Sequence, residues 1–428
     1  MNKFSITKIY PSQQQTFKVI FLRRYMINTK IDLSKIETIN CGIVGHIDHG
    51  KTTLLQRLSN KWADTHSEEL KRGITIKLGY ADTIIRKENG KLTVDKNSSG
   101  KPVKYITFVD APGHEMLMAT MLSGAAIMDA AILVIAANEG IKPQTKEHLI
   151  ALKAKKIKKI IIVQNKIDLV SKEKALENYK KIKEFIKGSV AENSAIIPIS
   201  AQQEINLEKI LEELCKIEIK RSPKDKKPIF LIARSFDINK PGSKIENLHG
   251  GVLGGALKSG ELKVGDIIEI KPGYFYEKHN QHFYKTVKSK IISMQKGNYK
   301  ISNATPGGSL AIETELDPAL TKSDSLSGGI AGIEKTLPEI TTEITIKFTL
   351  FDEVFGTEKK ESVKEIKINE MLMLSLNTSI TVGQITKISK NSCNLKLKIP
   401  VVPLKGESIG IAKNLNDHWR LIGFGEII

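Results

Sequence analysis

The stretch Gly45–Thr52, GHIDHGKT, fits a phosphate-binding loop, in which two glycines with four residues between them precede a lysine and a hydroxyl residue. The apolar run 39–44 predicts a buried strand before it, and the apolar spacing of 53–58 predicts a helix after it. In that context backbone N–H groups surround a phosphate at a helix N-terminus. We expect Lys51 to reach the terminal phosphates and the Thr52 hydroxyl to bind Mg²⁺. The loop residues expected to contact the nucleotide are Asp48, His49, Gly50, Lys51, Thr52 and Thr53.

Strands and helices alternate around this loop, from about residue 36 to 220. The apolar β-rich runs are 39–44, 105–109, 130–136, 160–164 and 195–199, and helical patterns include 144–155, 172–187 and 206–216. Such alternation predicts a mostly parallel sheet wound on both sides by helices. Ligands of such sheets bind at the carboxyl ends of the strands. Polar motifs follow several of these runs.

The second motif, DAPGH at Asp110–His114, directly follows the apolar run 106–109. An aspartate that leaves a buried strand ahead of Pro-Gly can hold Mg²⁺ through a water, and the N–H of Gly113 can approach a γ-phosphate. The same turn occurs in many ordinary loops. Its place at a strand end, downstream of a phosphate loop, favours the functional interpretation.

The third motif, NKID at Asn165–Asp168, specifies the base. The carboxylate of Asp168 can accept hydrogen bonds from N1–H and the 2-amino group of guanine, and adenine offers no such pair of donors. We expect Asn165 to meet the Hoogsteen edge and hold neighbouring loops, and the stem of Lys166 to lie over the ring. A fourth motif, Ser200, Ala201 and Gln202, can offer a backbone N–H to the guanine carbonyl oxygen. Each motif alone is weak, but their order at successive strand ends predicts a guanine-nucleotide-binding domain.

Between the first two motifs, residues 64–76 are polar and charged and end in Gly-Ile-Thr. GTP hydrolysis calls for a loop that folds over Mg²⁺ and the γ-phosphate and releases afterwards. Thr75 is the expected Mg²⁺ ligand of this loop. A solvated helix is the alternative for the GDP state.

Composition limits the partners and the compartment. The net charge of +19 and the pI near 9.5 favour polyanionic partners, above all nucleic acid; a lysine-rich surface that serves solubility or thermal stability is the alternative. The three scattered cysteines, Cys41, Cys215 and Cys393, form no disulfide or zinc pattern, which indicates a reducing, cytoplasmic environment. The sequence has no apolar run long enough to span a membrane, and Arg23-Arg24 after the apolar patch 17–22 argue against a signal peptide.

The rest of the chain suggests further domains. Residues 1–35 are polar and basic and predict a poorly ordered extension, and it stays open whether residues 1–25 belong to the mature chain. The GTP-binding domain is expected over 36–220, followed by a charged, proline-bounded linker. Short β-rich segments between glycine turns then predict two β-barrel domains, 228–336 and 337–428. The expected fold class is thus an α/β GTPase domain followed by two β-barrels.

This arrangement resembles the translational GTPases related to elongation factor Tu. More narrowly, it is similar to the γ subunits of archaeal and eukaryotic translation initiation factor 2, over about residues 38–428. The stretches that carry the narrower resemblance are 64–80, 190–193, 234–242 and 419–425. Many relatives carry a zinc knuckle, but the equivalent stretch here, 86–104, has no cysteine and reads as a plain hairpin around Asn89-Gly90. We therefore predict no zinc.

The resemblance implies a GTPase that carries initiator methionyl-tRNA to the small ribosomal subunit and hydrolyses GTP to GDP on start-site recognition. It implies a heterotrimer, with an α subunit on the second domain and a β subunit on the GTPase domain. Mg²⁺ would be held by Thr52 and Thr75, with Asp110 acting through water and Asp48 and the Gly73 carbonyl nearby, and His114 would orient the attacking water. Two other functions stay open. One is an elongator-type or specialised aminoacyl-tRNA carrier, and the other is a non-translational scaffold switched by GTP.

Overall fold

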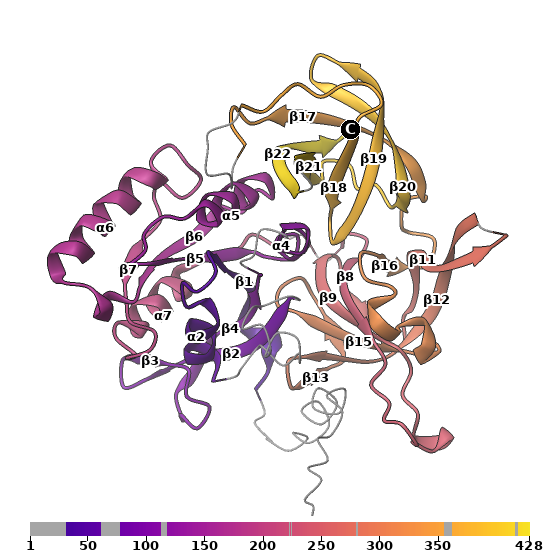
Figure 1. The fold of residues 1–428 in the computed structure, drawn as a ribbon. Helices are drawn as coiled ribbons and strands as arrows, with labels where there is room; N and C mark the ends of the chain where they lie inside the picture. Colours follow the sequence, from indigo (N-terminus) through magenta and orange to yellow (C-terminus); the bar gives the residue numbers. More distant parts are fainter. Residues whose placement is uncertain are drawn as a thin grey trace, which may run out of the picture.

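The computed structural model describes residues 31–60, 78–112, 118–221, 223, 225–279, 281–354, 362–415 and 418–428. Figure 1 shows three units, an α/β domain and two all-β units, packed around a common centre. Of the predicted N-terminal extension, residues 1–30 lie outside the described residues. Residues Leu33–Lys35 form the short 3₁₀ helix η1, and the side chain of Leu33 is buried.

The α/β domain, which we call the G domain, contains a seven-stranded sheet of order β3-β2-β4-β1-β5-β6-β7. Strands β1, β4, β5, β6 and β7 pair in parallel, and β2 and β3 are antiparallel. The predicted hairpin turn at Asn89-Gly90 joins β2 and β3, and both residues have positive φ. The strands are β1 Glu37–Gly45, β2 Gly79–Glu88, β3 Lys91–Thr93, β4 Lys101–Asp110, β5 Ala130–Ala136, β6 Lys159–Asn165 and β7 Ile196–Pro198.

Helices cover both faces of this sheet, as the sequence predicts. Apolar residues of two helices pack with one face, α2 (Lys51–Ser59) and α7 (Leu207–Lys216). Three other helices pack on the opposite face, α4 (Met118–Ala125), α5 (Pro143–Ala154) and α6 (Lys172–Ile186). The mostly parallel, doubly wound sheet is thus confirmed.

The first all-β unit closes into a barrel because β11 pairs with both β16 and β12. The ring runs β11-β16-β8-β9-β15-β12, with β13 beside β12. Alternate residues of its strands point inward, for example Phe230 and Ile232 of β8. The strands are β8 Ile229–Phe236, β9 Val252–Ser259, β10 Leu262–Lys263, β11 Ile267–Lys278, β12 Gln281–Lys296, β13 Tyr299–Ile301, β14 Asn303–Ala304, β15 Leu310–Thr314 and β16 Ile330–Ile333. The 3₁₀ helices η4 Ile245–Asn247, η5 Pro318–Leu320 and η6 Lys322–Asp324 lie in its loops.

The second barrel is a closed ring of six strands in the order β17-β20-β19-β18-β21-β22. The β-rich runs of the sequence, 343–350, 370–376, 381–388, 395–400 and 421–427, predict five of these strands but not β21 (Ser408–Leu415). Residues Ser408–Ala412 of β21 are all buried, so this strand shows no alternation of exposed and buried positions. The others are β17 Thr341–Leu350, β18 Met371–Leu376, β19 Ser379–Ser389, β20 Ser392–Val401 and β22 His418–Ile427.

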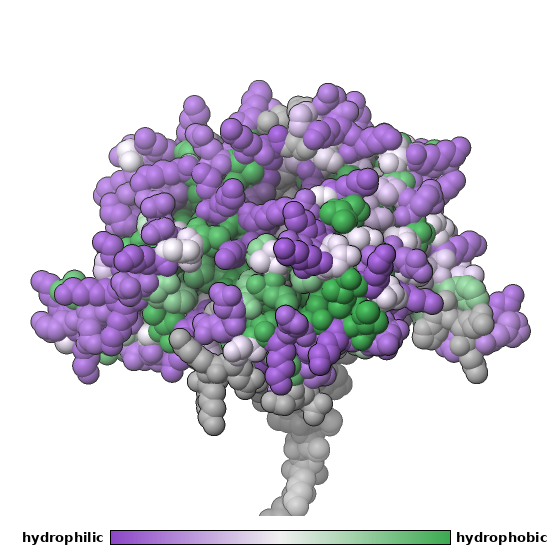
Figure 2. Space-filling model, turned by 90° about the horizontal axis from the view of Figure 1, so that it is seen from above, coloured by the Kyte–Doolittle hydropathy of each residue, from purple (hydrophilic) through white to green (hydrophobic). Residues whose placement is uncertain are grey.

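One hydrophobic core cluster contains residues of all three units. It joins side chains of α4 and α5 to Leu231 and Ala256 of the first barrel and Leu421 of the second. Seen from above, the surface is mainly hydrophilic, with smaller hydrophobic areas toward the middle of the face (Figure 2). Among the described residues, no helix is both long and apolar enough to cross a membrane.

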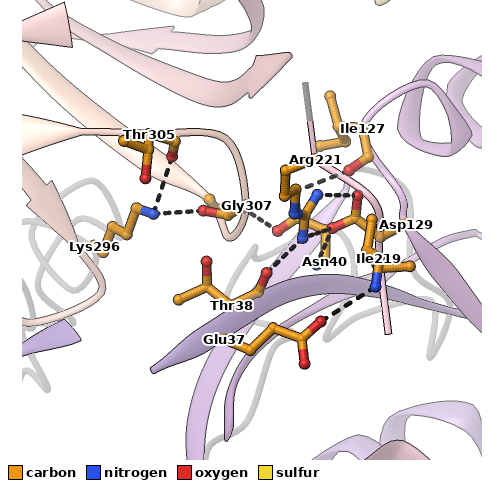
Figure 3. Close-up of polar contacts among 11 residues, drawn as sticks. Glu37, Thr38, Asn40, Ile127, Asp129, Ile219, Arg221, Lys296, Thr305 and Gly307 are labelled. Atoms are coloured by element: carbon orange, nitrogen blue, oxygen red, sulfur yellow. Dashed lines mark hydrogen bonds and ion pairs between the residues drawn. The ribbon is translucent and has the colours of Figure 1, made fainter. Parts of the chain in front are cut away.

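Polar contacts lie on both sides of the border between the G domain and the first barrel (Figure 3). Arg221 donates to both carboxylate oxygens of Asp129, at 2.6 and 2.9 Å, and also to the carbonyl of Thr38. On the barrel side, Lys296 donates to the carbonyls of Thr305 and Gly307 at 3.3 and 2.6 Å. A Cβ atom on Gly307 would lie 2.5 Å from Oγ1 of Thr38, so only glycine fits this close approach.

Helix α5 ties the G domain to the second barrel. Glu147 accepts a hydrogen bond from the Arg420 guanidinium at 3.1 Å, and both residues are buried. Just beyond the helix, Lys155 donates to the carbonyl of Ser375 at 2.9 Å. The more exposed pair Lys156–Glu426 joins the same two units at 2.8 Å.

Helix α5 also holds the end of β1, where the phosphate loop starts. The backbone N–H of Gly45 donates to Nδ1 of His148 at 2.8 Å. An Nδ1 that accepts a hydrogen bond carries no proton, so the ring is neutral with its proton on Nε2. Burial agrees with this, because it lowers the pKa of His148 from 6.5 to about 3.

We predict that the free energy of unfolding decreases as the pH falls from 7 to 5, in part because of His148. In the unfolded chain His148 takes up a proton near pH 6.5, whereas in the folded chain it does so only at about pH 3. The folded state therefore becomes less stable as the pH decreases through this window. At about 1.4 kcal/mol per pH unit, this residue alone costs about 2 kcal/mol at pH 5. Urea titrations at several pH values measure the loss.

Two variants separate the proton from the hydrogen bond. His148→Asn keeps a side-chain acceptor for the Gly45 N–H but has no titratable group, and His148→Ala loses both. Both should flatten the pH dependence of the unfolding free energy equally, while the alanine variant should be less stable at pH 7 by about 1–3 kcal/mol. A wild-type pH dependence in both variants would contradict the prediction.

Candidate functional site

The motifs singled out in the sequence follow neighbouring parallel strands of the G domain. The register pairs Ile43 with Asp110 and Ala136 with Asn165, so the strand ends coincide at one edge of the sheet. Gly45, Asp110 and Asn165 are the last residues of β1, β4 and β6. The edge thus gathers the segments that the sequence analysis assigns to phosphate, metal and base.

The phosphate loop turns sharply between β1 and α2. Asp48 has φ 60° and Gly50, the N-cap of α2, has φ 89°, both in the left-handed region. A Cβ atom on Gly50 would lie 2.3 Å from Nδ2 of Asn165, so the position has no room for a side chain. Lys51 is buried and donates from Nζ to the carbonyl of His46 at 2.8 Å, which bends it back over the loop.

The predicted metal ligands are partly brought together. The hydroxyl of Thr52 donates to Oδ2 of Asp110 at 3.2 Å, and Asp110 is fully buried. Hydroxyl and carboxylate oxygens are ligands that Mg²⁺ accepts, so this donor set fits the predicted ion. Asp48 lies exposed at the tip of the loop. Gly73, Thr75, Gly113 and His114 lie outside the described residues.

Asn165 joins the phosphate loop to the loop after β7. Its Nδ2 donates to the carbonyl of His49 at 2.9 Å, and its Oδ1 accepts from the N–H of Ala201 at 3.0 Å. Both polar atoms of this buried amide are therefore satisfied within the protein. The arrangement agrees with the loop-holding role expected from the sequence.

The other base-motif residues lie more openly. Lys166 has φ 62°, and Asp168 lies in the 3₁₀ helix η3 (Ile167–Leu169) with an exposed side chain. After β7, Ser200 and Ala201 are buried, and exposed Gln202 accepts from Arg57 of α2 at 3.4 Å through its carbonyl. The exposed carboxylate of Asp168 is available to a ligand, and its pairing with guanine stays a prediction.

Two residues at this edge were missed from the sequence. Glu139 follows β5 and lies within 4.0 Å of Nε2 of His49 and 3.7 Å of Nζ of Lys166, between the phosphate and base loops. Of the four central strands, β1, β4 and β6 are each followed by a motif and β5 is not. The polar residues after β5 could therefore have been examined for a site residue, and Glu139 would have been found. His148 had none, because it lies inside α5, far from any strand end in the chain.

Positive charge in the phosphate loop comes from lysine and not from histidine. Burial lowers the pKa of His49 to about 3, and its Nδ1 lies 3.3 Å from the carbonyl of Val134. Burial also lowers the pKa of His46. Both rings are therefore neutral at pH 7, and Lys51 is the cation of the loop available to an anionic ligand.

Family models match both ends of the chain. Residues 36–219 match the model "Elongation factor Tu GTP binding domain", and residues 342–427 match "Initiation factor eIF2 gamma, C terminal". Among solved structures, a bacterial selenocysteine-specific elongation factor aligns with TM-score 0.72 and 25% identity, over 91% of this chain and 58% of that one. Elongation factor SelB from Methanococcus maripaludis, with the GTP analogue GppNHp, aligns with TM-score 0.67 and 23% identity, over 92% and 79%.

Curated relatives match nearly the whole chain and share one name, translation initiation factor 2 subunit gamma. The protein from Methanococcus maripaludis strain C6 is 50% identical over 402 residues, which are 91% of this chain and 98% of the relative. That from Methanosarcina mazei is 51% identical over 91% and 93%, and that from Archaeoglobus fulgidus 48% identical over 96% and 98%. The chain belongs to the family of translation initiation factor 2 subunit gamma, and it is a GTP-binding translational GTPase.

Proposed function

We propose that this GTPase carries initiator methionyl-tRNA to the small ribosomal subunit and hydrolyses its GTP on start-site recognition. The observation that carries the proposal is identity near 50% with translation initiation factor 2 subunit gamma over 91% of the chain, which includes all three units. The proposed domains are 36–220, 228–336 and 337–428. The three free cysteines suit a reducing cytoplasm as the place of action.

The proposed nucleotide contacts follow the geometry of the strand ends. Phosphates lie over the N-terminus of α2, where the backbone N–H groups of residues 48–53 and Lys51 face them. Asp168 accepts from guanine, Lys166 covers the ring, and the loop 200–202 offers an N–H to the guanine carbonyl. Asn165 holds the phosphate loop and the loop 200–202 together through its hydrogen bonds to His49 and Ala201.

Mg²⁺ would be held by Thr52 and Thr75, with Asp110 acting through water and Asp48 and the Gly73 carbonyl as further candidates. Bound there, the ion would neutralise charge on the β- and γ-phosphates. Gly113 offers an N–H to the γ-phosphate, and His114 orients the attacking water. Hydrolysis then needs mainly a positioned water and stabilised charge. The sequence offers no obvious arginine finger in the loops expected around the γ-phosphate, so we expect intrinsic turnover to be slow without a partner.

The proposed partners are an α subunit on the first barrel, a β subunit on the G domain, initiator tRNA and the small ribosomal subunit. The term "subunit" in the relatives' name supports a multi-subunit factor. The net charge of +19 supports an RNA partner, because phosphate neutralisation releases counterions. No zinc takes part in the proposal.

An aminoacyl-tRNA carrier for elongation is the second candidate function. The structural likeness to a selenocysteine-specific elongation factor, with TM-score 0.72, favours it specifically. The match of residues 342–427 to the family model "Initiation factor eIF2 gamma, C terminal" favours initiation. A non-translational scaffold has no observation in its favour.

We predict that Asp168→Asn weakens binding of GDP and GTP by about 10²-fold or more and favours xanthine nucleotides. An amide in place of the carboxylate meets the 2-amino group of guanine donor to donor, whereas it can donate to the 2-oxo group of xanthine. Calorimetric titration with both nucleotide families measures this. Glu204→Gln, an exposed carboxylate paired with Arg57 near the same edge, should change neither affinity.

We predict that His114→Ala slows partner-stimulated GTP hydrolysis by about 10²-fold while nucleotide affinity stays unchanged. The imidazole is expected to act on the attacking water and not on bound GTP. Single-turnover hydrolysis with small ribosomal subunits measures the rate, with His249→Ala in the first barrel as the control. An unchanged stimulated rate would remove His114 from the mechanism.

We predict that the protein with its α subunit retains initiator methionyl-tRNA on a filter with a GTP analogue, and much less with GDP. An elongator aminoacyl-tRNA should be retained poorly in both states. Equal retention of both tRNAs would support the elongation candidate. Retention of neither would contradict the proposed role as a tRNA carrier.

A further inference from the structure

The strands β11 and β12 continue past the point where β11 pairs with β16 and form a hairpin that is rich in aromatic residues. Figure 1 shows this hairpin projecting from the first barrel on the side away from the G domain. Five aromatic residues lie within positions 274–284, and Phe275, Tyr276 and Phe283 are 47%, 38% and 38% exposed. Aromatic side chains mostly supply buried contact area, so their exposure together on one hairpin points to a partner.

The two faces of the hairpin differ in what they contact. Residues directly opposite each other in an antiparallel pair lie on the same face, and successive residues of a strand alternate between faces. Phe275 is opposite Tyr284, and Tyr284 lines a hollow of about 310 Å³ against β18, β19 and β20 of the second barrel. The face that carries Tyr276 and Phe283 is therefore turned away from the second barrel, and we call it the outer face.

Tyr276 and Phe283 form a stacked pair on the outer face. Their ring centroids lie 5.5 Å apart, with an angle of 22° between the ring planes. The ring of Tyr274 lies 5.8 Å from that of Tyr276 and packs against the core of the first barrel. The pair is thus joined to the barrel by a row of rings, so its apolar surface is in place before any partner binds.

Lysines flank the aromatic pair on the same face. Lys285 is opposite Tyr274, and Lys278 comes two positions after Tyr276, so one lysine lies on each side of the pair along the hairpin. Both lysine side chains are exposed. The acidic residue of this stretch, Glu277, alternates to the other face. Among the described residues of the hairpin, the outer face therefore combines aromatic surface with positive charge.

Aromatic rings between lysines suit single-stranded RNA. Unpaired bases stack on exposed rings, and ammonium groups neutralise the phosphates that link the bases. Paired bases are less suitable, because a duplex keeps them stacked on one another. A protein partner is less suitable too, since lysine is depleted where protein interfaces are buried. The net charge of +19 agrees with a partner that carries phosphate.

We propose that the outer face of the β11–β12 hairpin binds single-stranded RNA other than the tRNA that the protein is proposed to carry. Unpaired bases stack on Tyr276 and Phe283, and Lys278 and Lys285 neutralise the phosphates on either side. The hairpin projects away from the G domain, so this RNA reaches it without crossing the nucleotide site (Figure 1). The surface does not depend on the carrier role.

Fluorescence anisotropy of a short labelled oligouridylate, titrated with the full chain, tests the proposal. Tyr276→Leu and Phe283→Leu keep apolar side chains but remove the rings, and each should weaken binding by about five- to a hundredfold. Tyr276→Phe keeps the ring and should bind as the wild type does. Binding of the same RNA annealed to its complement should not change in any of these variants.

The lysine contacts are measured by the salt dependence of the same binding. Each phosphate neutralised on a single strand contributes about 0.7 to the slope of log K against log salt concentration. Lys278→Gln and Lys285→Gln should each lower the slope by about that amount. Lys183→Gln, which changes an exposed lysine of α6, should leave the slope as it is.

Matched controls separate the stacking surface from the stability of the hairpin. Phe275→Leu breaks the aromatic pair of the other face, in which the rings of Phe275 and Tyr284 lie 5.6 Å apart. Ile292→Ala removes an exposed apolar side chain of β12. Neither should weaken RNA binding. A loss in Phe275→Leu equal to that in Tyr276→Leu would overturn the proposal, as would unchanged binding in both Tyr276→Leu and Phe283→Leu.

Two further measurements distinguish this RNA from other partners. Unlabelled initiator methionyl-tRNA should not displace the oligouridylate, and Tyr276→Leu should retain that tRNA on a filter as the wild type does. Displacement would assign the hairpin to the carried tRNA and overturn the proposal. Unchanged RNA binding with loss of the α subunit in Tyr276→Leu would also overturn it, in favour of a protein contact. The anisotropy measurement itself needs no tRNA, so failure of the carrier role would leave its result standing.

Discussion

Parallel pairing of β1 with β4 and β5, and of β5 with β6, is the constraint on which the rest of the structure depends. The register places Asp110 beside Ile43 and Asn165 beside Ala136, so each strand reaches the same edge at its own motif. A shift of one residue would turn buried side chains toward the other face of the sheet. The fully buried pattern of β5 makes such a shift costly, since its neighbours pack on both faces.

Short polar contacts then fix the loops that the sheet brings together. Asn165 bonds to two loops at once, Thr52 meets Asp110, and Lys51 folds back on the carbonyl of His46. Bonds of this kind hold the loops near the shape that a phosphate requires, so binding costs less conformational entropy. Lys51 must exchange its carbonyl partner for phosphate oxygens, which are the stronger charge-assisted acceptors.

The G domain and the two barrels are in contact with one another. The half-buried Arg221–Asp129 pair lies on the G-domain side of the border with the first barrel, and the buried Glu147–Arg420 pair crosses the border with the second barrel. A buried ion pair adds little net stability, because desolvation offsets the attraction, but it penalises a misplaced partner strongly. The Glu147–Arg420 pair therefore fixes the orientation of the second barrel on α5. Thr378, in the turn between β18 and β19, adds a contact shared by all three units, because its carbonyl accepts from Ser123 of α4 and its hydroxyl donates to the carbonyl of Ile232 in β8.

Much of this protein could be predicted from its sequence, because the information is local. Strand, loop and helix periodicity predicted the doubly wound sheet, and the places of the motifs GHIDHGKT, DAPGH and NKID after apolar runs predicted that the strands before them end at one edge of it. The strand β21 was not predicted, because burial on both faces removes the alternation of apolar and polar residues that marks a strand. Glu139, His148 and Thr378 were decided only by the tertiary structure. Each acts across a distance of many residues in the chain, through a contact that exists only once sheets and barrels have packed, and no local pattern of residues encodes such a contact.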